Sequence, residues 1–402
     1  MINSKEMISL DEAFKITDKV LSRIDLPRET VHIDNALGRT TVRDQVSLLD
    51  IPPFDKSAMD GYAVLADDER SEYRLLETVP AGGVPTIPLK PGTATKVMTG
   101  AAVPEGSGKV IMIEKTSESD GNIRILCPET EGNICLKGED VRRGDVVLPA
   151  FSLLGPLEIA NLISAGFTEL KVARPLKVSI LATGDEIVDS YDRLTPGRIM
   201  NSNGPMLAGL CRQHHLQVVD SSIVHDDPGA TVQALREALE KADIVVLSGG
   251  VSVGDFDFVA AAMNELDLKI HFDRVAVKPG KPVTFATSPQ KTLFGLPGNP
   301  VSVFLMFHLF VLRAAKLMLG RQPEVRHITL PLAGTFQRRN AKRLAYVPSR
   351  LTKDGALEQV AYHGSAHLQA LLKSDGFFMV PEGVEKITES QKVTFMPIKG
   401  SL

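Results

Sequence analysis

Carboxylates and lysines alternate in four glycine-broken loops in the third quarter of the chain. These loops are Thr183-Gly184-Asp185-Glu186, residues 248–255, Lys278-Pro279-Gly280-Lys281-Pro282 and Leu296-Pro297-Gly298-Asn299-Pro300. Each lies where a strand of an α/β sheet is expected to end, and ligands of open α/β sheets bind outside the carboxyl ends of the strands. Mg²⁺ takes one or two protein carboxylates together with phosphate oxygens, and lysines neutralise the remaining charge. The loops therefore predict a site for a phosphorylated, nucleotide-like ligand.

The acids in and near these loops point to a divalent cation. They are Asp185, Glu186, Asp226, Asp255 and Asp257. Five carboxylates at neighbouring strand ends repel one another unless Mg²⁺ or positive side chains offset them. Helix capping is the alternative explanation, and Asp227 before a proline is expected to cap a helix whatever else it does. Because the acids outnumber the caps, the sequence implies Mg²⁺.

The elements that must hold these loops alternate strand and helix between residues 175 and 325, which is typical of a parallel sheet covered by helices. The expected strands are 177–182, 217–224, 244–247 and 293–296, and the expected helices are 204–214, 228–241, 258–266 and one that follows Asn299. The apolar run 301–312 within that last helix is shorter than the ~20 residues of a membrane span. We therefore expect it to be a buried core helix.

Other domains flank this region. A capping-box spacing at Ser9 to Glu12 starts an amphipathic helix, which we expect to pack on a second helix at 156–166. Short β-type runs at 109–114, 122–127 and 145–148 precede that second helix, and similar runs at 328–332, 344–347, 377–380 and 393–397 end the chain. The prediction is a multidomain α/β protein. Its parts are a discontinuous helical and linker N-terminal domain (1–43 and 148–174), a β-rich inserted domain (44–147), a central three-layer α/β domain with a mostly parallel sheet (175–325) and a C-terminal β-domain (326–402).

Composition excludes several function classes. The 402 residues are 43% hydrophobic and carry a net charge of -4, so neither nucleic acid nor an anionic membrane is an expected partner. The three cysteines form no CxxC pair, which favours a reducing compartment with buried thiols and makes zinc unlikely to be bound. The first residues do not form a signal peptide. No Ser-His-acid constellation and no Walker A motif stands out in the sequence. The expected location is the cytoplasm.

Several ordered motifs together resemble one family. They are the loops above with Pro52 to Val64, Met98-Thr99-Gly100-Ala101, Gly138-Glu139-Asp140 and Gly197 to Asn203. From about residue 9 to residue 400 the chain resembles the molybdopterin molybdenumtransferases, known in bacteria as MoeA, and ordered motifs are more specific than any single one. The resemblance implies a four-domain homodimer that takes adenylylated molybdopterin and molybdate, inserts the metal and releases AMP. It leaves room for transient contact with other proteins of cofactor biosynthesis.

The resemblance also implies roles for particular residues. A small dianion such as molybdate needs several hydrogen-bond donors and compensating cations. Lys278 and Lys281 beside a Pro-Gly turn could supply them; the alternative is that these two lysines are simply solvated. The implied catalytic residues are Asp60, Thr99, Asp140 and Glu186. The implied metal ligands are Glu186, Asp226, Asp227 and Asp257. The implied substrate-binding residues are Lys278, Lys281, Pro282, Ser252, Pro297, Pro300, Ser302, Arg343 and Ser365.

Two segments depart from the family pattern. Cys135-Leu136-Lys137 replaces an arginine-rich stretch, and the register of Arg343 is open. Two other functions are alternatives. A molybdopterin adenylyltransferase shares the glycine-rich pattern of the central domain but lacks the extra domains, and a non-enzymatic dimeric scaffold is disfavoured because no long linker or tail is present.

Overall fold

The computed structural model describes residues 7–21, 27–250, 258–289 and 291–398. The chain forms two compact units. Unit one comprises Met1–Arg28 and Ala173–Leu402, and unit two comprises Glu29–Val172.

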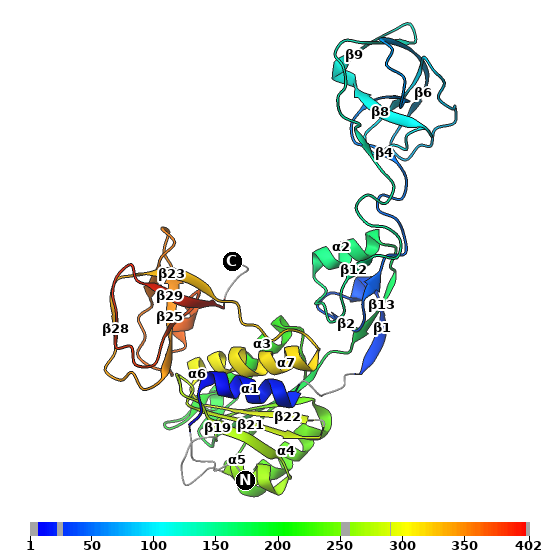
Figure 1. Ribbon diagram of the computed structural model, residues 1–402. Coiled ribbons are helices and arrows are strands. Elements are labelled where there is room, and N and C mark those ends of the chain that lie inside the picture. Colours follow the sequence, from blue (N-terminus) through cyan, green and yellow to red (C-terminus); the bar gives the residue numbers. More distant parts are fainter. Residues whose placement is uncertain (1–6, 22–26, 251–257, 290, 399–402) are drawn as a thin grey trace. The chain divides into compact units, whose positions relative to one another are not determined.

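A six-stranded sheet lies at the centre of unit one (Figure 1). In spatial order its strands are β17 (Gln217–Val224), β14 (Lys177–Thr183), β18 (Ile244–Ser248), β22 (Lys291–Leu296), β21 (Pro282–Ser288) and β19 (Lys269–Arg274). The first four strands pair in parallel, and β21 and β19 pair antiparallel at one edge. The mostly parallel sheet is confirmed, whereas the two edge strands were not predicted.

Helices cover both faces of this sheet and make the expected three layers (Figure 1). One face carries α1 (Leu10–Leu21), α3 (Asn203–Gln213) and a long helix composed of α6 (Pro300–Met306), the π-helical η4 (Phe307–Val311) and α7 (Leu312–Met318). The other face carries α4 (Pro228–Lys241) and α5 (Phe258–Glu265). Asp227 caps α4 as predicted, because its Oδ1 accepts the Ala230 N–H at 2.8 Å and Pro228 follows it.

The opening helix packs differently from our expectation. Its capping bond forms, with Ser9 Oγ accepting the Glu12 N–H at 3.1 Å. Its apolar face, however, joins the core of unit one, where Phe14 meets Phe310 edge-on at 5.6 Å and the Arg313 guanidinium lies 4.2 Å from the Phe14 ring centre. Arg313 also binds Asp18. An aromatic contact with Phe310 in η4 and a cation–π contact with Arg313 in α7 thus hold α1 in unit one, whereas residues 156–166 belong to unit two.

The long apolar helix is longer than the run 301–312 suggested. It covers Pro300–Met318, 19 residues, and is long and apolar enough to span a membrane by length and composition alone. Two-thirds of its apolar window is nevertheless buried inside the protein, and residues such as Phe307 and Phe310 are fully enclosed. Burial, rather than shortness, is therefore what supports the assignment as a core helix.

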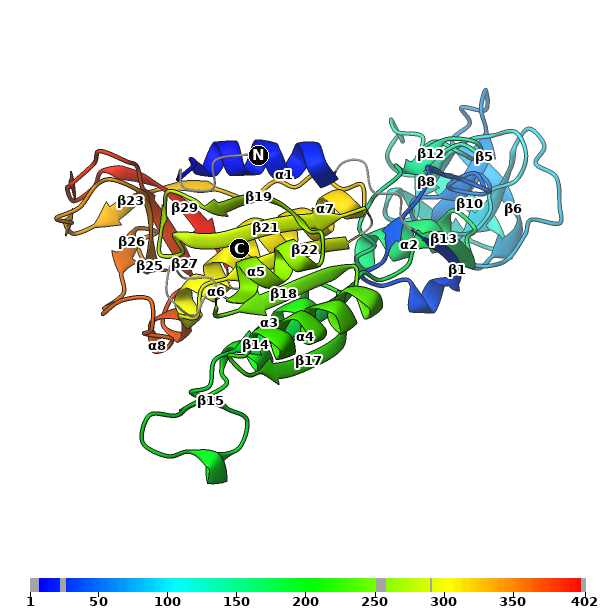
Figure 2. The same cartoon turned by 90° about the horizontal axis from the view of Figure 1, so that it is seen from below.

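A β-barrel follows the central domain in unit one. Its strands are β25 (Leu344–Leu351), β26 (Leu357–Gln359), β23 (Ile328–Ala333), β29 (Lys392–Pro397) and β27 (Gly376–Val380), closed by the pairing of β25 with β27. The strand β20 (Val277–Lys278) leaves the central domain and pairs with β25, so that Lys278 lies opposite Ala345. The remaining elements of unit one are β15 (Ile187–Val188), η3 (Tyr191–Arg193), β16 (Ile199–Met200), β24 (Phe336–Gln337), α8 (Gln369–Leu372) and β28 (Lys386–Ile387). The segment that carries β15 projects from the sheet (Figure 2).

Unit two contains two main sheets. The first has β1 (Arg28–His32), β13 (Glu169–Ala173) and β2 (Thr40–Thr41) beside the helix α2 (Pro156–Ser164). The second, in spatial order, has β8 (Ser107–Met112), β5 (Gly61–Leu65), β7 (Thr93–Val97), β6 (Glu72–Val79), β10 (Asn122–Ile125) and β9 (Thr116–Ser119). Short elements complete the unit: η1 (Ile33–Asn35), β3 (Gln45–Val46), β4 (Lys56–Ser57), η2 (Ile113–Lys115), β11 (Ile134–Cys135) and β12 (Val146–Leu148).

The cysteines differ from the expectation of buried thiols. All three are free, but only Cys211 is buried, while Cys135 is half-buried and Cys127 exposed.

Candidate functional site

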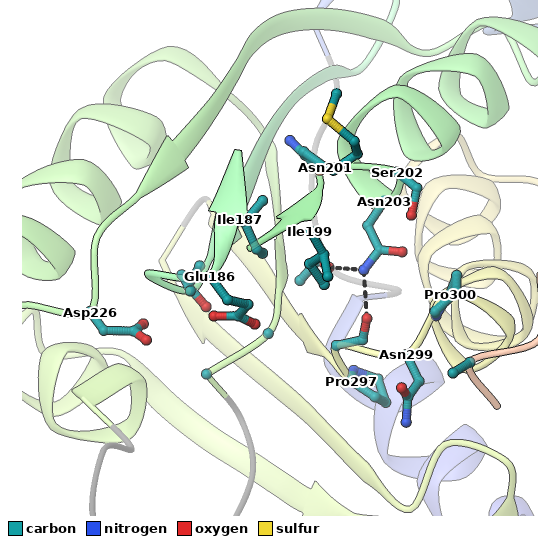
Figure 3. A pocket seen from close by; sticks show the side chains of 18 of the residues that line it. Glu186, Ile187, Ile199, Asn201, Ser202, Asn203, Asp226, Pro297, Asn299 and Pro300 are labelled. Atoms are coloured by element: carbon teal, nitrogen blue, oxygen red, sulfur yellow. Dashed lines mark hydrogen bonds between the residues drawn. The ribbon is translucent and has the colours of Figure 1, made fainter. Parts of the chain in front are cut away.

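A cavity of about 670 Å³ lies where β14, β17, β18 and β22 end at their carboxyl ends (Figure 3). Sequence reasoning predicted that the loops after these strands would meet, and they do. The lining residues are Thr183, Gly184, Glu186, Ile187, Ile199, Met200, Asn201, Ser202, Asn203, Asp226, Ser248, Gly249, Gly250, Pro282, Pro297, Gly298, Asn299, Pro300 and Ala366. The cavity therefore has a polar floor at the strand ends, with aliphatic and proline side chains beside it.

Two glycines allow the loops to approach so closely. Gly249 has φ +96, and a Cβ there would lie 2.5 Å from the backbone oxygen of Thr183. Gly184 has φ +141, and its Cβ would lie 2.4 Å from Oε2 of Glu186. Only glycine fits such positions without strain. The Glu186 carboxylate therefore folds back over the backbone of its own loop.

The acids separate into two kinds. Glu186 and Asp226 both line the cavity, and their carboxylates extend toward the same part of it (Figure 3). Asp227 instead uses its Oδ1 to cap α4. Within the described residues, no three His, Cys, Asp or Glu side chains converge in a way that would hold a metal ion. Of the implied metal ligands, Glu186 and Asp226 line the cavity, Asp227 caps α4, and Asp257 lies outside the described residues. Two carboxylates remain, which fits the habit of Mg²⁺ to complete its shell with phosphate oxygens.

One serine and two aspartates of the predicted site lie outside the described residues. They are Ser252, Asp255 and Asp257.

A polar side chain that sequence reasoning did not select holds three loops together. Asn203, at the start of α3, donates from Nδ2 to Ser248 Oγ at 2.8 Å and to the Gly298 oxygen at 2.7 Å (Figure 3). Its Oδ1 and the Oγ1 of Thr183 are buried without a hydrogen-bond partner in the part of the chain that the structure describes. Buried polar atoms of this kind are uncommon and call for an explanation such as a bound ligand. The signal was present, because Asn201-Ser202-Asn203 belongs to the motifs that carried the resemblance.

Two of the predicted oxyanion residues, Arg343 and Ser365, lie in the barrel and contact the central domain. Arg343 Nη1 donates to the Val277 oxygen at 3.1 Å, which sets Arg343 beside the Lys278 strand. Ser365 Oγ accepts from Asn299 Nδ2 at 2.9 Å, and the Ser365 oxygen accepts the Val301 N–H at 3.0 Å. The barrel thus contributes Arg343 and Ser365 to the edge of the central domain.

These residues differ in how near they come to the cavity. Pro282, Pro297 and Pro300 line it, as does Ala366 beside Ser365. The other predicted substrate residues of the described chain lie outside the lining: Lys278, Lys281, Ser302, Arg343 and Ser365. Ser302 is buried at 3% exposure in α6. Lys278 and Lys281 are exposed, so their charges are available to an anion from solvent.

The predicted catalytic residues of unit two share one small region. Segments 51–60, 98–102 and 133–141 are joined by three backbone bonds. They run from Gly100 N to the Ser57 oxygen, from Ala58 N to the Asn133 oxygen and from Asp140 N to the Ile51 oxygen. Asp60 accepts two bonds from Thr99, and both residues are exposed. Asp140 is also exposed. In the segment that departs from the family pattern, the Lys137 N–H donates to Asp55 Oδ1 at 2.7 Å and Lys137 Nζ lies 3.5 Å from Asp50 Oδ2.

The fold and the cavity define a multidomain α/β protein with a ligand site at the carboxyl edge of its central sheet. Three domain families match it: the MoeA N-terminal region (domain I and II) at residues 8–166, a probable molybdopterin binding domain at 179–317, and the MoeA C-terminal region (domain IV) at 333–398. The chain belongs to the MoeA family, the molybdopterin molybdenumtransferases.

Individual relatives agree in both sequence and structure. A molybdopterin molybdenumtransferase of Staphylococcus epidermidis is 33% identical over 396 residues, covering 95% of this chain and 93% of the relative. One of Staphylococcus aureus is 36% identical over 371 residues, covering 89% and 88%. The crystal structure of a molybdopterin biosynthesis MoeA protein from Pyrococcus horikoshii superposes with a TM-score of 0.83 at 30% identity, covering 98% of this chain and 100% of that one.

Proposed function

We propose that this enzyme transfers molybdenum from molybdate to adenylylated molybdopterin and releases AMP, in the biosynthesis of the molybdenum cofactor. One observation carries the proposal: in a chain of this family, two carboxylates and two buried polar atoms without a partner among the described residues line one cavity at the sheet edge. Such a cavity suits a ligand that brings both phosphate groups and hydrogen-bonding ring atoms.

The carboxylates of the site and its basic and hydroxyl side chains would bind different groups. Glu186 and Asp226 would hold Mg²⁺, which neutralises phosphate charge when bound. Lys278, Lys281, Arg343 and Ser365 would bind molybdate beside the start of α6, because a tetrahedral dianion needs cations and donors rather than apolar area. Cleavage of the adenylyl phosphate bond needs no protein nucleophile, since an oxygen of molybdate or of water attacks and AMP leaves.

Unit two would supply the remaining catalytic groups. Asp60, Thr99 and Asp140 are exposed, and backbone bonds join the segments that carry them, but they lie far in sequence from the cavity loops. We propose that the protein is a cytoplasmic homodimer in which these residues complete the cleft of a partner copy. This arrangement predicts complementation between inactive variants.

The decisive experiment incubates pure protein with adenylylated molybdopterin, molybdate and Mg²⁺ and measures AMP. Molybdate-dependent AMP release supports the proposal. Consumption of ATP with free molybdopterin would instead identify an adenylyltransferase, and neither reaction would favour a non-enzymatic scaffold. Glu186→Ala is the matched negative control, because it removes a carboxylate of the cavity while Gly184 and its turn stay unchanged.

A further inference from the structure

Two loops of the cavity are joined by a reciprocal pair of hydrogen bonds. Asp226 Oδ2 accepts the backbone N–H of Asp185 at 3.3 Å, and Asp185 Oδ1 accepts the backbone N–H of Asp226 at 3.3 Å. Asp185 directly precedes Glu186, and both Glu186 and Asp226 line the cavity. The pair thus ties the loop after β14 to the loop after β17 at the point where both carboxylates enter the site.

Two positive or donating groups hold Asp185 in this arrangement. His225 Nδ1 lies 3.1 Å from Asp185 Oδ1, and Arg198 Nη1 donates to the Asp185 backbone oxygen at 3.1 Å. An ionised carboxylate only accepts hydrogen bonds, so Nδ1 of His225 carries the hydrogen. Asp185 Oδ1 therefore receives two hydrogens, one from a ring and one from the backbone beside that ring.

The consequence concerns Asp226. Because one of its oxygens is fixed by the Asp185 N–H, the direction of its carboxylate is set, and Figure 3 shows it extending toward Glu186. A cation shared by two carboxylates and a phosphate requires them at a fixed spacing. We propose that Asp185 and His225 are positioning residues that hold the Asp226 and Glu186 carboxylates ready for Mg²⁺ and the phosphates of the substrate. This inference rests on the proposed function.

The exposure of Asp185 and His225 indicates that they contribute little to the free energy of unfolding. The side chains of Asp185 and His225 are 68% and 78% exposed. Exposed pairs contribute little to the free energy of unfolding, so substitutions here should leave the fold intact. Any change in Mg²⁺ binding then reports on the site rather than on unfolding.

The test measures Mg²⁺ binding by calorimetry on the full chain with AMP present, so that it does not depend on turnover. Asp185→Ala should weaken Mg²⁺ binding about tenfold, since it removes the Oδ1 that accepts the Asp226 N–H and the His225 Nδ1 hydrogen and so loosens the loop that carries Asp226. Asp185→Asn should stay within about threefold of the wild type, because the amide Oδ1 still accepts both hydrogens. If loss of negative charge were the cause, both variants would weaken Mg²⁺ equally, and the positioning role would be overturned.

His225 offers an independent comparison. His225→Ala should lower the affinity for Mg²⁺ about threefold. His225→Asn should keep the wild-type affinity, because the Asn Nδ2 can donate where the His Nδ1 did. Asp189→Ala is the matched control, because Asp189 is a similarly exposed acid four positions along the chain. Among the described residues its side chain pairs only with Arg193, at 3.4 Å. It should bind Mg²⁺ as the wild type does. Equal Mg²⁺ affinity in Asp185→Ala and Asp189→Ala contradicts the inference.

The same titrations separate this inference from the proposed function. If Asp226→Ala and Glu186→Ala both keep wild-type Mg²⁺ affinity, the cation site itself is wrong, and the positioning role falls with it. If they lose Mg²⁺ while Asp185→Ala and His225→Ala do not, only the positioning role is wrong. Urea midpoints equal to that of the wild type must accompany each result that supports it.

Discussion

Thr99 donates two hydrogen bonds to a single oxygen of Asp60. Its backbone N–H lies 2.6 Å and its Oγ1 2.7 Å from Asp60 Oδ1, and the two residues are 39 positions apart in the sequence. The backbone bond, and then the hydroxyl bond, hold the pKa of Asp60 below its ordinary value. Asp60 is thus an ionised, oriented carboxylate at the surface of unit two, which suits a residue that acts on a ligand from elsewhere.

Replacing Thr99 by Val should raise the pKa of Asp60 toward its ordinary value of 3.8 without reaching it, because the hydroxyl bond is lost and the backbone bond remains. Thr99→Ser keeps both bonds and is the control. A carboxyl ¹³C NMR titration follows Asp60 directly. An unchanged pKa in Thr99→Val would show that the hydroxyl does not contribute.

Lys278→Ala and Lys281→Ala should each weaken molybdate binding at least about tenfold, since a charge-assisted contact contributes roughly 1.5 to 3 kcal/mol. Lys241→Ala is the control, because Lys241 is an exposed lysine at the end of α4 that pairs loosely with Glu237 at 3.9 Å. Equilibrium dialysis with molybdate measures the affinity. Wild-type affinity in both folded variants would remove these lysines from the site.

Gly249→Ala should destabilise the protein by about 2 kcal/mol, because the new Cβ meets the Thr183 oxygen and the residue keeps a positive φ. Gly209→Ala should instead stabilise the protein. Gly209 lies within α3 with nothing within 4 Å of the new Cβ, and alanine there should raise the free energy of unfolding by about 0.5 to 1 kcal/mol. Urea unfolding gives both values. Equal midpoints for the two variants would contradict the close approach of the β14 and β18 loops.

Asp243 should govern part of the acid sensitivity of unit one. It accepts from Arg174 Nη1 and Nη2 at 2.7 Å each and from the Lys177 N–H at 2.8 Å. Burial alone would raise the pKa of Asp243, but these hydrogen bonds outweigh it, and the pKa is lowered below 3.8. A lowered folded-state pKa adds stability that is complete above the unfolded-state pKa and is lost as the pH falls through the folded-state value.

Asp243→Asn should therefore cost about 2 kcal/mol at neutral pH and flatten the loss of stability between about pH 5 and about pH 2. Urea midpoints measured across that range test it. If the variant and the wild type lose stability in parallel, Asp243 is not the group responsible.

Local signals explain what could be predicted from the sequence. Ser9 and Asp227 cap their helices as expected, because a cap depends on residues within one turn. Buried apolar runs mark β14, β18 and β22, and the alternation of strand and helix indicated the more polar edge strand β17. Their order in the chain places the loops at one edge of the sheet. The strands β19 and β21 were missed because the Lys278 to Pro282 turn and mixed polarity interrupt their pattern.

What sequence reasoning missed depends on distant partners. Asn203 joins residues 45 and 95 positions away, and the motif that contains it does not show which residues it binds. The partner of α1 is likewise set by Phe310 and Arg313, almost 300 positions along the chain. The resemblance implied a metal-binding role for Asp227 besides its expected cap, and its Oδ1 forms that cap.

A homodimer with a shared cleft should allow two inactive variants to complement each other. If Asp140 acts in a partner's cleft, then mixing inactive Asp140→Ala chains with inactive Glu186→Ala chains should restore one intact cleft in each mixed dimer. Random exchange then gives about a quarter of wild-type AMP release. Mixing Glu186→Ala with Asp226→Ala is the control: both residues line the same cavity of unit one, so no mixed dimer regains a complete site. Two affinity tags verify that subunits have exchanged. Background activity in the first mixture after proven exchange, or equal recovery in the control, would show that the cleft is not shared in this way.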